Sequence, residues 1–104
     1  MSFKSQQEQV DVWAQQFAVP YWQPLEMMAR LTEETGELAR EINHRFGPKK
    51  KKSTESAAEM GDEIADIMFT LICIANAQDI DLDEAFDRCM EKVGVRDANR
   101  FEKK

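Results

Sequence analysis

Two short acidic stretches carry side chains whose types and spacing could do chemistry. The first contains Glu34 and Glu37, and the second, further along the chain, contains Glu63 and Asp66. Residues three and four apart lie on one face of a helix, so each stretch places two carboxylates side by side. If the two faces meet, their oxygens form a cage that suits a hard divalent cation. The sequence therefore predicts a metal site built from two helices.

Electrostatics decides whether such a cage needs a cation. Two carboxylates about 4 Å apart repel by roughly 4 kcal/mol at an effective dielectric constant of about 20, so four converging carboxylates are expected to require one. The alternative is that these acids lie on solvated helix faces, which a chain with 20 acidic residues readily produces. Gly36 favours a site, because a glycine within a helix costs about 1 kcal/mol relative to alanine and lets a ligand approach closely.

Hydrophobic periodicity predicts an all-α domain of four to five helices. The low glycine and proline counts, 4 and 3, agree with this class. Ser5 and Glu8 have the spacing of a capping box, and Pro24 suits the first position of a helix. We expect one domain over residues 1–104, with helices at about 5–18, 24–45, 54–78 and 81–93 and a short C-terminal segment to 104.

The apolar residues of the third expected helix indicate an assembly. Between Ile67 and Ala75 the third helix is apolar on almost every side, and such a helix must be covered on every side. Three other short helices could hardly do this alone, so we expect a homodimer or a dimer of dimers. The second helix carries an apolar stripe that is expected to face the core, formed by Leu25, Met28, Leu31, Leu38 and Ile42.

Composition excludes several classes of partner. A net charge of −6 argues against broad binding to nucleic acid or to acidic membranes. The N-terminus has no apolar signal region, and no run approaches the roughly 20 apolar residues of a membrane helix. We therefore expect a cytoplasmic protein. The block Lys49–Lys52 is either a solvated loop or a flexible lid over a phosphorylated ligand.

The two acidic motifs also resemble a known family. The segment EETGE at 33–37, followed by EIADIMFTLICIANAQDIDLDEAF from residue 63, is similar to the MazG-type nucleoside triphosphate pyrophosphohydrolases, whose pattern is EExxE and then ExxD. The resemblance covers roughly residues 13–96. It implies an all-α fold in which helix pairs from two subunits form a four-helix bundle. Its metal ligands would be Glu34, Glu37, Glu63 and Asp66.

The resemblance also implies the reaction. Mg²⁺, with Mn²⁺ as a substitute, would bridge the phosphates of a nucleoside triphosphate, and attack at the α-phosphorus would release the monophosphate and pyrophosphate. Glu33 would help to position the attacking water or a ligand. Lys92 and Arg96 match the basic pair of the family and would hold the outer phosphates, although both could instead be solvated charges at a helix end. Lys50, in the lysine block, is a further candidate for the phosphates.

Base recognition needs an aromatic platform or a hydrogen-bonding pocket. The candidates are Trp13, Phe17, Trp22 and His44, and Trp22 beside the proline-bounded break is the first choice. For Trp13 and Phe17, a place in the core is the favoured alternative. The resemblance thus implies an enzyme that clears unwanted or excess nucleotides. The alternative is a non-catalytic helical dimerisation module that retains a nucleotide- or metal-sensing pocket.

Overall fold

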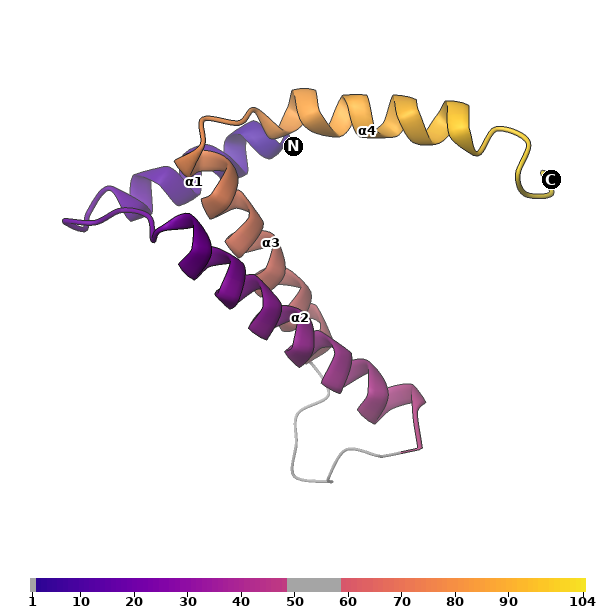
Figure 1. The fold of residues 1–104 in the computed structure, drawn as a ribbon, viewed down its shortest axis with the longest axis horizontal. Helices are drawn as coiled ribbons and strands as arrows, with labels where there is room; N and C mark the ends of the chain where they lie inside the picture. The colour runs from indigo at the N-terminus through magenta and orange to yellow at the C-terminus, as the bar shows by residue number, and fades with distance from the viewer. Residues whose placement is uncertain (1, 49–58) are drawn as a thin grey trace.

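The computed structural model describes residues 2–48 and 59–104, and these ranges contain four α-helices and no strand (Figure 1). The all-α prediction is therefore confirmed. The block Lys49–Lys52, and with it Lys50, lies outside the described residues. None of the helices in the described ranges combines the length and apolar character needed to cross a bilayer. The helices are α1 (Phe3–Ala14), α2 (Pro24–Phe46), α3 (Glu59–Ala77) and α4 (Leu82–Arg96).

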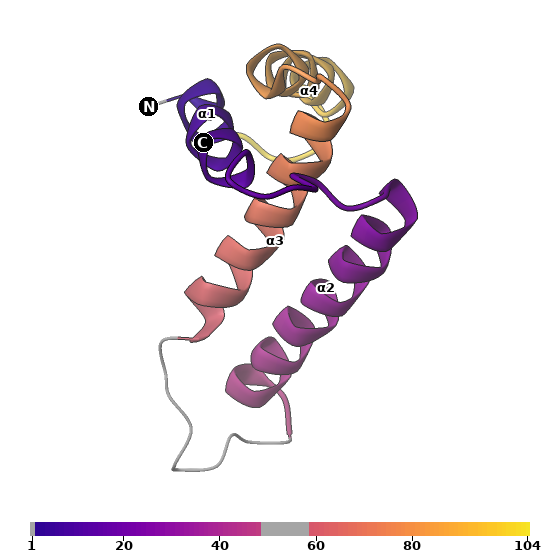
Figure 2. The same cartoon turned by 90° about the vertical axis from the view of Figure 1, so that its left-hand side faces the viewer.

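An antiparallel pair of helices, α2 and α3, forms the frame of the molecule. Both views show the two helices side by side along most of their lengths (Figure 1, Figure 2). Helix α1 packs against α3 and also contacts the start of α4, and α4 then leads away from the pair. Among the described residues the buried apolar core is small and consists of Ala14, Met27, Ile72 and Ala75.

Helix α1 begins and ends earlier than the capping pattern predicts. It starts at Phe3 because the carboxylate of Asp83, in the first turn of α4, accepts hydrogen bonds from the backbone N–H groups of Phe3 (2.9 Å) and Lys4 (3.2 Å). The ring of Phe3 also lies 5.1 Å from that of Phe86. The start of α1 is therefore fixed by α4 and not by Ser5.

Local signals set the starts of the second and fourth helices. Pro24 occupies the first turn of α2, and the side chain of Glu26 accepts a hydrogen bond from the backbone N–H of Gln23 at 3.2 Å. The side chain of Asp81 caps α4, because its Oδ1 accepts from the N–H groups of Asp83 (2.9 Å) and Glu84 (3.2 Å). Such caps satisfy backbone donors that a helix leaves unpaired at its start.

The apolar stripe expected for the second helix is not a core in the single subunit. Leu25, Met28 and Ile42 are 84%, 51% and 44% exposed. Helix α2 instead buries Met27, Glu34, Glu41 and His44, three of which are polar. The periodicity identified an apolar face correctly, but the face that packs on α3 is the one that carries the acids.

Candidate metal centre and substrate cavity

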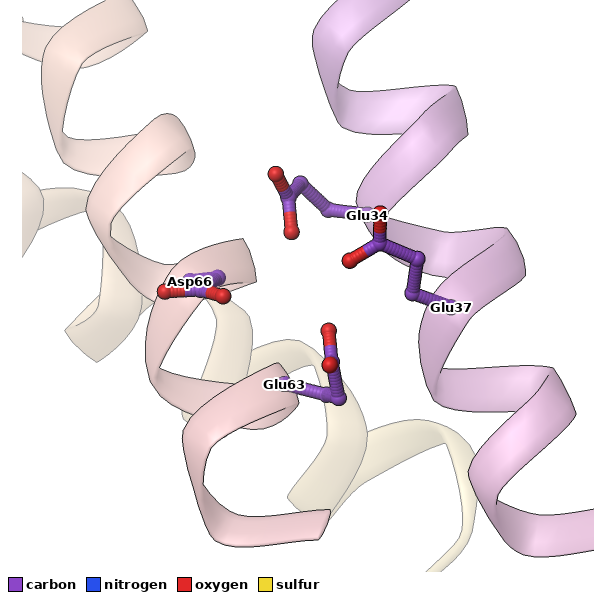
Figure 3. A group of neighbouring side chains, drawn as sticks. All are labelled: Glu34, Glu37, Glu63 and Asp66. Atoms are coloured by element: carbon purple, nitrogen blue, oxygen red, sulfur yellow. The ribbon is translucent and has the colours of Figure 1, made fainter. Parts of the chain in front are cut away.

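Four carboxylates meet between α2 and α3. Glu34 and Glu37 point from α2 towards Glu63 and Asp66 on α3 (Figure 3). One oxygen of each residue lies within 4.8 Å of an oxygen of every other. The antiparallel packing of the two helices therefore brings the acidic pairs face to face, as their spacing predicted.

Two oxygens of this cluster have no hydrogen-bond donor among the described residues. Glu34 is only 4% exposed. Its Oε2 and the Oε2 of Glu63 are buried and form no hydrogen bond with the described residues. A buried, unpartnered carboxylate oxygen is costly, and a hard cation would satisfy both. The donor set, oxygen only and negatively charged, thus fits a divalent cation such as Mg²⁺ or Mn²⁺.

The pKa of Glu63 reports the crowding of these charges. Burial raises the pKa of this carboxyl above its usual value of 4.5. A hydrogen bond with Glu37 and the negative charges of Glu37, Asp66 and Glu34 raise it further. A proton therefore relieves part of the repulsion in the metal-free protein, and a divalent cation, with its double charge, would relieve more of it.

A cation of the protein itself, Arg30, lies one helical turn before the cluster. Its Nε donates to Oε1 of Glu34 at 2.6 Å. Its guanidinium carbon also lies 5.9 Å from the ring centroid of Trp22. Arg30 therefore links the carboxylates to the aromatic segment before α2. Arg30 was not among the site residues predicted from the sequence, although its position four residues before Glu34 is a recognisable signal.

An aromatic cavity of about 450 Å³ opens on the other side of Arg30. Its walls come from α1, the segment 15–23, α2 and α3, and include Trp13, Phe17, Tyr21, Trp22, Arg30 and Phe69. The ring of Trp13 lies 5.1 Å from that of Phe17 and 5.7 Å from that of Phe69. Trp13 and Phe17 are about half exposed. Their expected place in the core was therefore wrong, because both line a cavity.

The other candidates occupy different places. Trp22 lines the cavity, whereas His44 is buried near the opposite end of α2. Seventeen residues separate Met27 from His44, about 25 Å along a helix, so the subunit does not bring His44 to the cavity. Glu33 is exposed and does not belong to the four-carboxylate cluster.

The predicted phosphate-binding pair is also away from the cluster within one subunit. Lys92 and Arg96 are exposed on α4, which projects away from the α2–α3 pair (Figure 1). The guanidinium of Arg96 pairs with Asp97 at 3.2 Å. One subunit therefore provides the carboxylates and Arg30, but not this basic pair.

Comparisons with known proteins agree with this geometry. Residues 23–101 match the family model of the MazG nucleotide pyrophosphohydrolase domain. The chain belongs to this family. It is 52% identical over 103 residues to the protein YpjD of Bacillus subtilis (strain 168). The aligned region covers 99% of this chain and 93% of YpjD. The resemblance that the acidic motifs indicated is thus confirmed.

Two crystal structures resemble this MazG chain closely. The crystal structure of B. subtilis YpjD has a TM-score of 0.82 to this chain at 54% identity, and the match covers 88% of this chain and 94% of the YpjD chain. That of the Bacillus-conserved MazG protein, a nucleotide pyrophosphohydrolase, has a TM-score of 0.78 at 42% identity and covers 88% of each chain. Fold and family therefore agree on a MazG-type nucleotide pyrophosphohydrolase.

Proposed function

We propose that this MazG chain hydrolyses nucleoside or deoxynucleoside triphosphates to the monophosphate and pyrophosphate, with Mg²⁺ held by Glu34, Glu37, Glu63 and Asp66. The observation that carries the proposal is the convergence of these four carboxylates, two of which have a buried oxygen that accepts no hydrogen bond from residues 2–48 or 59–104. Mn²⁺ has the same preference for oxygen ligands and is expected to substitute for Mg²⁺. Removal of unwanted or excess nucleotides is the proposed role.

The residues around the cluster divide the work on the substrate. Mg²⁺ bound there would neutralise phosphate charge and lower the pKa of a coordinated water. The aromatic cavity would hold the base, with Trp22 as its platform. Arg30 lies between the cavity and Glu34, so its guanidinium is suited to the phosphate nearest the nucleoside. Glu33 would orient the attacking water from the same helix.

The outer phosphates need further positive charge, which the proposed assembly could supply. In a homodimer or a dimer of dimers, the exposed Lys92 and Arg96 of one subunit would be able to approach the cluster of another. The assembly is supported by the large apolar side chains that α2 and α3 leave exposed. A contribution of Lys50 stays a prediction from the sequence, as does that of His44.

Identification of the products tests the proposed function. Purified protein with Mg²⁺ and a panel of triphosphates should release monophosphate and pyrophosphate, and EDTA should abolish turnover. Glu34→Gln and Glu63→Gln should each lower kcat/KM by about 100-fold or more, the range seen when a group that stabilises transition-state charge is lost. Asp62→Asn is the matched control, because Asp62 is exposed and lies beside Glu63 on α3 but outside the four-carboxylate cluster. Release of diphosphate and orthophosphate, or normal turnover in both glutamine variants, would contradict the proposal.

The alternative is a non-catalytic dimerisation module with a sensing pocket, which the exposed apolar residues of α2 and α3 would also suit. Thermal melts with and without Mg²⁺ and nucleotide distinguish the two. A ligand that binds only the native state raises stability by mass action. A large rise in Tm without turnover would favour the sensing module.

A further inference from the structure

The hydroxyl of Tyr21 ties the segment between α1 and α2 to two helices. It donates to Oδ1 of Asp11 on α1 at 2.5 Å and accepts from Nδ2 of Asn76 on α3 at 3.1 Å. Among the described residues, the backbone of 18–22 forms no hydrogen bond. The position of this segment therefore depends on one phenol group and on the packing of its side chains.

Asn76 is in turn held from both ends of its amide. Its Nδ2 also donates to the backbone carbonyl of Gln7 at 3.0 Å, and its Oδ1 accepts from Nε2 of Gln7 at 3.0 Å. The same Nε2 donates to the carbonyl of Ile80 at 2.8 Å, and Oε1 of Gln7 accepts from the N–H of Leu82 at 3.0 Å. The amide of Asn76 is thus locked in one orientation, with a proton aimed at Tyr21.

This network borders the aromatic cavity and not the carboxylates. Tyr21 and Trp22 form part of the cavity wall. Asn76 lies ten residues beyond Asp66 on α3, about 15 Å along the helix. A change at Asn76 or at the hydroxyl of Tyr21 can therefore move the wall that would meet the base, while the metal centre keeps its geometry.

We infer that Asn76 is a positioning residue for substrate binding, which acts by fixing Tyr21 and, through it, the Trp22 wall of the cavity. The inference rests on the proposed function, because it assumes that the cavity holds the base. It assigns to Asn76, Gln7 and Asp11 a role in KM and not in kcat. Without the hydrogen-bond network the cavity wall at Trp22 samples several positions, of which only some bind the substrate. The apparent affinity for the substrate then falls, and KM rises.

Steady-state kinetics of Tyr21→Phe tests the inference, since this change removes the hydroxyl and keeps the ring. KM for the best triphosphate should rise about five-fold, the change that corresponds to one lost hydrogen bond, while kcat stays within about two-fold. Asn76→Ala should have the same effect. Asp11→Asn should keep the KM of the wild type, because its side-chain carbonyl still accepts from Tyr21, whereas Asp11→Ala should resemble Tyr21→Phe.

Tryptophan fluorescence provides a second readout that needs no turnover. The chain has two tryptophans, and both line the cavity. Titration with the monophosphate product in EDTA should quench the wild-type emission, and the apparent Kd should rise about five-fold in Tyr21→Phe, in parallel with KM. In the free protein, acrylamide should quench the emission of Tyr21→Phe and Asn76→Ala more strongly than that of the wild type.

Asp83→Ala is the control for a loss of stability alone. Asp83 caps the same α1 helix but does not line the cavity. Its substitution should lower Tm and leave KM and the fluorescence titration unchanged. An unchanged KM in both Tyr21→Phe and Asn76→Ala, or a loss confined to kcat, would overturn the inference while an active wild type upholds the proposed function. A wild type that neither hydrolyses triphosphates nor binds the monophosphate would overturn both.

Discussion

Glu63 is the residue at which function and stability conflict. Its pKa is raised in the folded, metal-free protein, so the folded state binds more protons than the unfolded chain above pH 4.5. Stability without metal should therefore rise as the pH falls through the folded pKa towards 4.5, and should be lower at neutral pH. In EDTA at pH 7, Glu63→Gln should melt at a higher temperature than the wild type and should show a weaker dependence on pH.

Mg²⁺ should reverse this order. The wild type should gain stability with Mg²⁺, by about 2.7 kcal/mol at a concentration of 100 Kd, whereas Glu63→Gln should gain little. Differential scanning calorimetry between pH 5 and 8, with and without Mg²⁺, measures both effects. If Glu63→Gln is less stable than the wild type in EDTA, the crowding of carboxylates does not destabilise the folded protein.

The carboxylate cluster could be predicted from sequence because the spacing of its residues is local, whereas its surroundings could not. Two acids at i and i+3 share a helix face whatever the rest of the chain does. Which of two aromatic faces lines a cavity depends on the packing partner, so Trp13 and Phe17 were assigned to the core. The hydrogen bond between Gln7 and Asn76 joins residues 69 positions apart, and no local sequence pattern predicts it.

At the scale of the elements, a strained residue follows the end of α3. Asp79 has a φ of 54°. The N–H groups of Ile80 and Asp79 donate to the carbonyls of Ala75 (2.9 Å) and Asn76 (3.3 Å), which is the Schellman arrangement that usually places glycine at this position. Asp79→Gly should stabilise the protein by about 0.5–1 kcal/mol, and Asp79→Ala should destabilise it by about as much. Urea unfolding checks both, and a less stable glycine variant would contradict this account.

The start of a helix was predictable only where the residue that determines it is next to that start in the sequence. Pro24 and Asp81 mark the starts of α2 and α4, and both were read from the sequence. The start of α1 instead depends on Asp83, which is 80 residues from Phe3 along the chain. Asp83→Ala should therefore cost about 1 kcal/mol, as the loss of a helix cap does. Hydrogen exchange should show the loss at the first turn of α1, and unchanged protection there would refute the capping role.

At the scale of the whole molecule, the single chain exposes more surface than its mass explains. The accessible area is 8317 Å², whereas about 6,000 Å² is expected for a compact monomer of this mass. The radius of gyration is 17.2 Å, against about 13 Å for a compact domain of this length. The exposed apolar stripes, Leu25 and Met28 on α2 with Ile64, Met68 and Leu71 on α3, account for part of this excess.

These stripes recur at three and four residues, the spacing that lets helix pairs interlock into a bundle. A second copy would cover them with the same kind of surface, and the isologous contact would form a closed dimer. Light scattering should therefore give a mass that is a multiple of the 12.0 kDa of the chain. Met68→Glu should shift the mass towards the monomer and lower Tm, because a buried unpaired charge is costly. Gln9→Glu, an equal charge change on exposed α1, should change neither. A wild-type protein that stays a monodisperse monomer at high concentration would contradict the inference that a second copy covers the apolar stripes.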